Sequence, residues 1–355
     1  MNKAMPYLIV ILLTLINFPV NAQAIQEDRQ AARILAYYGI GHEASPATSV
    51  TTEQFNAHIN QLAHGHSQGD YNVIALPDVI EAYRQNTPLP DNAVVITFDG
   101  SEKSVLTHAA PLLKKHQFPF TVFLAPKRIR DDNPRFLNRK DIKRLRKNQL
   151  VNFGIHPDKY DAPTHYGVNE FDELSTIRAS LNNSVAFYRD LFGTQPKYLA
   201  FRHGVYSEMQ LRAIENYDFD AILGQHSGVA YHNPTGSILP RFVMTENYAD
   251  QNRFNMVTKA LPLPVDEVHP KPSVLKYKNP AIGFTSISNA TLDKLSCYAS
   301  GQAKPRLERL NDRIEIRLNE EISTSRFRVN CTLPVQNSTS KEIKWRWHGF
   351  LFEPL

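Results

Sequence analysis

An alternation of short apolar runs with segments of helical spacing constrains the fold more than any other feature. The apolar runs cover 33–38, 71–76, 93–98, 120–125, 150–155, 198–201 and 220–225. The helical patterns between them cover 52–65, 77–85, 103–116, 139–148, 170–191 and 207–216. Strands that are apolar on both faces and alternate with helices predict a parallel sheet covered by helices. This number of β/α units favours a barrel, complete or incomplete, over an open sheet.

The alternation stops after Arg241, and a different kind of sequence follows. Residues 261–272 are rich in proline and contain no glycine, which predicts an extended linker. Beyond it, DRIEIRL and RFRVNC alternate polar with apolar residues, as half-buried antiparallel strands do. We therefore expect an α/β domain over 25–260, a linker over 261–278 and a small all-β, sandwich-like domain over 279–355.

The N-terminus predicts export. Lys3 precedes an almost unbroken apolar run over 7–15, and Ala22 and Ala24 offer small residues to a signal peptidase. This order is typical of a cleavable secretory signal, which we assign to residues 1–24. A retained anchor is the alternative, but the run is shorter than the roughly 18–20 residues that a helix needs to cross a bilayer. We expect a periplasmic or secreted protein with no stable membrane span after cleavage.

The charged residues are mixed along the chain and favour no polyanionic partner. Lys and Arg number 40 against 35 Asp and Glu, which gives a formal net charge of +5. The basic cluster over 139–147 has the spacing of a solvated helix face. Nothing else in the composition indicates nucleic-acid binding.

The two cysteines, Cys297 and Cys331, both fall in the predicted β domain. In an oxidising compartment, an isolated pair within one small domain predicts a disulfide. Two buried free thiols are the alternative.

Candidate functional residues lie directly after the predicted strands, because the loops at the carboxyl ends of barrel strands carry the chemistry in such folds. Reading those ends in order gives Asp99, His156, Arg202 with His203, and His226. Asp99 follows a buried strand, and a capping role for the next helix is the alternative to a functional role. His156 occupies the equivalent place two units later, where a simple surface histidine is the alternative.

The segment VVITFDGSEKSVLTHAAPLLKKHQFPFTVFLA resembles the first motif of polysaccharide deacetylases, the NodB-homology domain of carbohydrate esterase family 4. In that motif a strand leads into Thr-Phe-Asp-Asp-Gly, a helix and a second strand. The resemblance covers roughly residues 30–245. It implies a distorted or incomplete β/α barrel and a hydrolase that removes acetyl groups from sugars. The implied partner is an acetylated polysaccharide or oligosaccharide.

The resemblance also implies a divalent metal, usually Zn²⁺ held by one Asp and two His, with a second Asp as general base. Asp99 takes the position of the base, but Gly100 stands where the ligand Asp belongs. His156 matches the first ligand His, and Tyr160 stands in place of the second. The ligand set is therefore incomplete, and nearby residues such as Asp158 would have to complete it.

On this resemblance the predicted site comprises catalytic residues and metal ligands: Asp99, Arg202 and His226 for catalysis, and His156, Tyr160 and Asp158 for the metal. Two hypotheses follow. The first is an exported deacetylase-like hydrolase with an altered metal site. The second is a catalytically inactive carbohydrate-binding protein of the same fold. In a third, weaker idea, Trp345 and Trp347 share one face of a strand and stack on sugars, although such a pair also suits a sandwich core.

Overall fold

The computed structural model describes residues 26–41, 45–157, 170–233, 238–287, 292–336 and 343–354. Within these ranges the larger part of the chain forms a curled sheet in the order β10-β9-β8-β7-β6-β5-β1-β11, with β4 beside β5. All neighbours in this sheet pair in parallel. Its strands are β1 (Ala32–Tyr37), β4 (Asn72–Val73), β5 (Ala93–Asp99), β6 (Phe120–Leu124), β7 (Val151–Ile155), β8 (Tyr198–Ala200), β9 (Ala221–Leu223), β10 (Ile238–Leu239) and β11 (Phe242–Val243).

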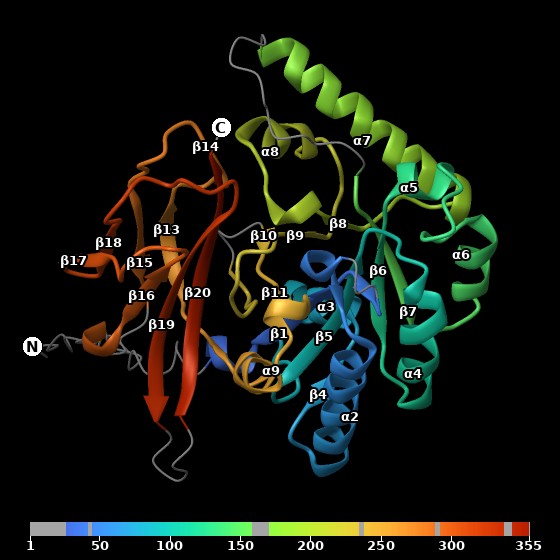
Figure 1. Ribbon diagram of the computed structural model, residues 1–355, viewed down its shortest axis with the longest axis horizontal. Helices are drawn as coiled ribbons and strands as arrows, with labels where there is room; N and C mark the ends of the chain where they lie inside the picture. Colours follow the sequence, from blue (N-terminus) through green and yellow to red (C-terminus); the bar gives the residue numbers. More distant parts are fainter. Residues whose placement is uncertain are drawn as a thin grey trace, which may run out of the picture.

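Helices follow these strands and pack around the sheet (Figure 1). They are α2 (Thr52–Gln68), α3 (Leu76–Gln85), α4 (Ala110–Lys115), α5 (Pro126–Arg130), α6 (Arg139–Leu145), α7 (Glu170–Phe192), α8 (Glu208–Ile214) and α9 (Gln251–Thr258). The strands β10 and β11 end the sheet without pairing with each other in the described residues. The incomplete β/α barrel predicted from the sequence is therefore confirmed, and α5 and α9 are helices that the sequence did not predict.

Both faces of β5 are covered, which explains its continuous apolar sequence. Val94, Ile96 and Phe98 belong to one buried cluster, and Ala93 and Val95 belong to another on the opposite face. Apolar side chains are favoured on a strand buried on both faces, and a charged side chain there is costly unless it is paired. The first charged residue of the strand is its last one, at the carboxyl end of the sheet.

The C-terminal all-β region forms two sheets that share one core. Its strands are β12 (Leu261–Pro262), β13 (Val265–His269), β14 (Val274–Leu275), β15 (Ile282–Ser286), β16 (Ser296–Ala299), β17 (Arg306–Leu310), β18 (Arg313–Arg317), β19 (Phe327–Gln336) and β20 (Ile343–Pro354). One sheet has the order β12-β20-β19-β16 with β14 beside β20, and the other has the order β13-β15-β18-β17. Phe284 and Ile314 from one sheet are buried with Val329 and Phe350 from the other.

The residues expected to form a linker, 261–278, contain three of these strands. β12 and β14 pair with β20, and β13 pairs with β15. Val265 and Leu275 are buried in the shared core, so their apolar side chains hold this segment against the β region. The β region therefore begins before residue 279.

No helix among the described residues has the length and apolar character that crossing a bilayer requires. The predicted signal peptide, residues 1–24, lies outside the described residues.

The predicted disulfide is confirmed. Cys297 on β16 and Cys331 on β19 face each other in antiparallel register and are bonded. Both are fully buried. The bond links the two strands across 34 residues of sequence.

Replacing both cysteines by alanine is expected to lower the free energy of unfolding by about 3–4 kcal/mol, because a closed loop of this length restricts the unfolded chain. Urea unfolding of the variant and the oxidised wild type measures the difference. Tyr298→Ala, an exposed change on the same strand, is the control and is expected to shift stability by less than about 0.5 kcal/mol. A cysteine-free variant as stable as this control would contradict the prediction.

Candidate active site at the mouth of the barrel

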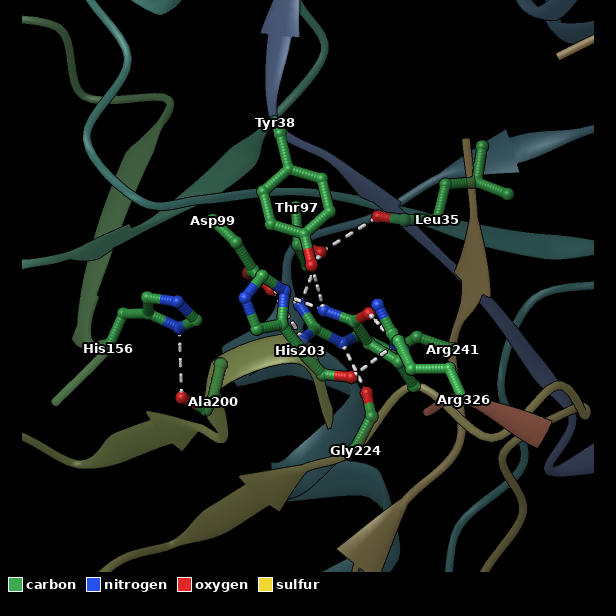
Figure 2. Close-up of polar contacts among 11 residues, drawn as sticks. Leu35, Tyr38, Thr97, Asp99, His156, Ala200, His203, Gly224, Arg241 and Arg326 are labelled. Atoms are coloured by element: carbon green, nitrogen blue, oxygen red, sulfur yellow. Dashed lines mark hydrogen bonds and ion pairs between the residues drawn. The ribbon is translucent and has the colours of Figure 1, made fainter. Parts of the chain in front are cut away.

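Asp99 lies at the carboxyl end of β5, fully buried, in an ion pair with Arg241 (Figure 2). Arg241 lies between β10 and β11. Its Nη1 donates to Asp99 Oδ1 at 2.8 Å and its Nη2 to Oδ2 at 2.7 Å. The same guanidinium donates to the Gly224 carbonyl at 2.8 Å and to Thr97 Oγ1 at 3.1 Å. Burial favours the neutral acid, but the charge and hydrogen bonds of Arg241 outweigh it and lower the pKa of Asp99 below its ordinary value.

Gln225 and Tyr38 complete the surroundings of the carboxylate. Gln225 Nε2 donates to Asp99 Oδ2 at 3.2 Å and also to the Tyr38 hydroxyl. Burial raises the pKa of Tyr38, so its phenol stays neutral at pH 7. The Asp99 carboxylate therefore accepts hydrogen bonds on both oxygens and is held in one orientation.

His156 follows β7 and lies close to Asp99. Its Nδ1 is 3.1 Å from the Ala200 carbonyl, and a carbonyl can only accept, so Nδ1 carries the proton. Burial lowers the pKa of His156 to about 4, although the charge of Asp99 opposes this shift. The imidazole is thus neutral at pH 7, with its lone pair on Nε2, the form that can bind a metal ion or accept a proton.

Gly100 marks the position where the resemblance places a metal-ligand carboxylate. Its φ is +88°, and a Cβ added there would lie 2.5 Å from Nη1 of Arg128. That nitrogen donates to the Gly100 carbonyl at 3.0 Å, and the guanidinium also lies over the Phe136 ring at 4.8 Å. The left-handed backbone conformation therefore disfavours a side chain at position 100, and one placed there would displace the end of the Arg128 side chain.

The described residues do not fit a three-ligand metal centre. No group of three or more His, Cys, Asp and Glu gathers among them in an arrangement that could hold a metal ion. Both oxygens of Asp99 are engaged, and His156 supplies a single nitrogen. Asp158 and Tyr160, the other predicted ligands, lie outside the described residues, so their roles stay predictions.

Arg202 and His203 form a turn, η3 (Arg202–Gly204), directly after β8. His203 adopts a left-handed conformation with a φ of +52°. Among the described residues, Arg241 rather than Arg202 makes the ion pair with Asp99. The predicted catalytic role of Arg202 therefore stays a prediction, and the structure places the residue on the rim of the mouth.

His226 lies between the barrel and the β region. It lines a cavity of about 500 Å³ together with Tyr206, Trp347 and His348. Burial lowers its pKa to about 4, with nearby Arg328 adding to the shift, so the imidazole is neutral at pH 7. A neutral imidazole lacks the extra proton that an acid needs to donate. Its predicted role as the acid stays untested.

The β region also reaches into the mouth. Arg326, just before β19, donates from Nη2 to the His203 carbonyl at 2.6 Å and to Gln225 Oε1 at 3.4 Å (Figure 2). Arg328, in β19, donates to the Gln225 carbonyl at 2.7 Å. The mouth is therefore built by both parts of the chain.

The two tryptophans have different surroundings. Trp347 is buried against Phe242, with ring centroids 5.4 Å apart, and its Nε1 donates to Asn330 at 3.1 Å. Trp345 lines a separate groove of about 560 Å³ beside α2 and α9, with Asn252 among its neighbours. Trp347 thus belongs to the packing between the two parts of the chain and also lines the cavity beside His226, whereas Trp345 lines the separate groove.

The sequence did not predict six residues of the mouth: Tyr38, Arg128, Gln225, Arg241, Arg326 and Arg328. Arg241 alone carried a signal, because it is an isolated charge in the apolar stretch 238–244 and such a charge needs a buried partner. Arg128 and Arg326 lie in polar stretches that look solvent-exposed.

Known protein sequences match the barrel part of this chain. Residues 86–222 match the family described as Polysaccharide deacetylase. A poly-beta-1,6-N-acetyl-D-glucosamine N-deacetylase of Staphylococcus aureus is 22% identical over 204 residues, covering 56% of this chain and 69% of that protein. The protein of the same name in Staphylococcus epidermidis is 25% identical over 173 residues, covering 47% of this chain and 58% of that protein.

Solved structures share the barrel fold. The Streptococcus pyogenes deacetylase PplD, in complex with acetate, superposes with a TM-score of 0.54 at 17% identity, covering 64% of this chain and 98% of its own. IcaB from Ammonifex degensii superposes with a TM-score of 0.55 at 17% identity, covering 65% of this chain and 97% of its own. At this level of identity the likeness concerns the fold.

Proposed function

We propose that the protein belongs to the polysaccharide deacetylase family, whose model its residues 86–222 match, and that it is an exported hydrolase with an altered metal site that removes acetyl groups from a sugar polymer. The observation that carries the proposal is Asp99, an ionised carboxylate at the carboxyl end of β5 with the neutral imidazole of His156 nearby. Asp99 stands at the position that the family resemblance assigns to the general base.

The chemistry requires an attacking water to lose a proton and the departing group to gain one. Asp99 is charged and oriented, so it is the group that would accept the proton of the water. Arg241 fixes this orientation but also lowers the pKa of Asp99, which weakens it as a base. His156 offers Nε2 to a water or a ligand. The described residues do not fit a three-ligand metal centre. We therefore assign Asp99 only the role of proton acceptor, and His156 only the binding of a water or a ligand through Nε2.

Export is supported by the sequence of residues 1–24 and by the disulfide, since such bonds persist in oxidising compartments. The substrate class is supported by the relatives named poly-beta-1,6-N-acetyl-D-glucosamine N-deacetylase. We therefore propose an acetylated polysaccharide or oligosaccharide, met in the periplasm or outside the cell, as the partner.

A second candidate function, carbohydrate binding without hydrolysis, is favoured by one specific contact. The Arg128 guanidinium lies against Gly100, where the resemblance expects a ligand to a divalent ion. A positively charged side chain at this place repels a metal cation and so opposes its binding. Under this candidate the barrel mouth still holds an acetylated glycan but releases no acetate.

Acetate release from acetylated chito-oligosaccharides and β-1,6-linked N-acetylglucosamine oligosaccharides tests the proposal, with and without added Zn²⁺ or Co²⁺. We expect release by the wild type and a fall of at least about 10²-fold in Asp99→Asn, because this variant loses the proton acceptor. Asp190→Asn, which removes an exposed carboxylate on α7, is the charge-matched control and should keep full activity.

Glycan binding, measured by calorimetry on the same proteins, separates the two candidates. Binding without acetate release by the wild type would reject the hydrolase and support the binding protein. Neither binding nor release would reject both.

A further inference from the structure

Among the described residues, the rim of the barrel mouth carries more arginines than carboxylates. Asp99 is matched by Arg241, and Glu102 is shared between Arg128, at 3.7 Å, and Arg135, at 3.0 Å. Two more guanidinium groups, those of Arg202 and Arg326, also lie on the rim, and neither forms an ion pair with any residue in the described part of the chain. Glu353 is a third carboxylate nearby, because the charge of Arg326 opposes the rise that burial causes in its pKa. The described part of the rim still has a surplus of cations.

Arg326 and Arg202 lie next to His203. Its carbonyl accepts a hydrogen bond from Arg326, and Figure 2 shows the Arg326 side chain beside it. Burial, together with the nearby charges of Arg326, Arg202 and Arg128, lowers the pKa of His203 to about 4. Three guanidinium groups from α5, η3 and the β region thus act on one imidazole.

The same arginines are accessible to a ligand. The Arg128 side chain is 34% exposed, Arg202 is half-buried and Arg326 is exposed. In its described hydrogen bonds Arg326 donates to uncharged acceptors, the His203 carbonyl and the Gln225 amide oxygen. Like charges brought together repel one another, and an anion placed between them would remove that repulsion.

We propose that Arg128, Arg202 and Arg326 form an anion-binding subsite, and that the glycan accepted by this mouth carries carboxylate or phosphate groups. The planar guanidinium matches both groups with paired hydrogen bonds. Arg128 lies beside Gly100, where the resemblance expects a metal-binding residue. A positively charged side chain of the protein would therefore contact the bound glycan there. This inference rests on the proposed function in either form, hydrolysis or binding.

The test compares oligosaccharides of equal length by calorimetry: a neutral N-acetylglucosamine oligomer, one alternating N-acetylglucosamine with a uronic acid, and one bearing phosphodiesters. The wild-type protein is expected to bind at least one anionic oligomer about tenfold or more tightly than the neutral one, and this preference should shrink as salt rises. The better of the two anionic oligomers identifies the anion.

Arg128→Gln, Arg202→Gln and Arg326→Gln are each expected to reduce the preference, while Arg202→Lys should retain part of it because the charge remains. Arg306→Gln is the matched control, since this arginine is 74% exposed on β17. Circular dichroism checks that every variant is folded. Sodium acetate and inorganic phosphate serve as free-anion probes.

The outcomes separate this inference from the proposed function. Equal binding of neutral and anionic oligomers, or a preference unchanged in all three variants, would overturn the subsite and leave the proposed function standing. Binding of free acetate or phosphate with no gain for anionic glycans would also overturn it, because the arginines would then recognise only small anions. If no oligomer binds, the inference is wrong, and the proposed function is wrong as well if no acetate is released.

Discussion

Arg241→Met is expected to lower the free energy of unfolding by about 3–5 kcal/mol, as removal of one partner from a buried ion pair does. The substitution leaves the Asp99 carboxylate fully buried without its countercharge. It also removes the donors to the Gly224 carbonyl and Thr97 Oγ1. Urea unfolding at pH 7 measures the loss.

A double-mutant cycle with Asp99→Asn isolates the electrostatic part of this loss. Once position 99 is neutral, Arg241→Met no longer strands a charge, so its cost should fall by about 2 kcal/mol or more. Arg84→Met is the surface control, because its side chain is 57% exposed in its pair with Glu81, and it should cost less than about 1 kcal/mol. The explanation fails if Arg241→Met costs no more than this control.

Acidification from pH 7 to pH 4 is expected to destabilise the protein through its buried neutral histidines. Burial lowers the pKa values of His58 and His156 to about 4 from an ordinary 6.5. Between these values the unfolded chain binds protons that the folded imidazoles do not. Their contribution is therefore complete above about pH 6.5 and falls as the pH drops, by up to about 1.4 kcal/mol per pH unit for each histidine.

Asp99 acts in a different pH window. Its folded pKa lies below its ordinary value of 3.8, so the stability it supplies is present above that pH and is lost only as the pH falls further. Glu27, whose pKa burial raises to about 7, gains stability as the pH falls through the same window and partly offsets the loss from the histidines. The share of one histidine is therefore read from the difference between its variant and the wild type.

Urea midpoints measured at several pH values from 7 to 4 test this prediction. His58→Gln removes one titrating group, so the slope of stability against pH should decrease by up to about one proton. His58 is the informative choice because it is fully buried, stacked on Phe254 at 3.9 Å and bonded to the Ala249 carbonyl. His64→Gln, an exposed change on the same helix, is the control. An unchanged slope in His58→Gln would rule out this histidine as a source of acid sensitivity.

The barrel was predictable because local sequence encodes burial on both faces of a strand. Runs such as that of β5 are apolar throughout, and the change to a charged residue at Asp99 marks the carboxyl end of the sheet. The same reasoning located His156 after β7. The start of the β region was harder to predict, because a proline in the sequence argues against a strand. β12 is nevertheless the two-residue strand Leu261–Pro262, and it lies at the edge of its sheet, where proline is tolerated.

The partners in the site could not be read from the sequence, because they come from distant parts of the chain. Arg241 is 142 residues from Asp99, and Arg326 is 101 residues from Gln225. Neither separation follows a periodic pattern. Gly100 was visible as a departure from the family motif, but only the structure shows the Arg128 guanidinium beside it. The sequence thus located the mouth of the barrel, and tertiary packing determined its charge.

The shared construction of the mouth has an evolutionary consequence. Arg326 and Arg328 belong to the β region yet bind the backbone of barrel residues His203 and Gln225, while the family match ends at residue 222. Under the proposed function, substitutions in the β region would change which glycans the mouth binds while every barrel motif stays intact. Classification by the barrel alone would group such proteins together although they bind different glycans.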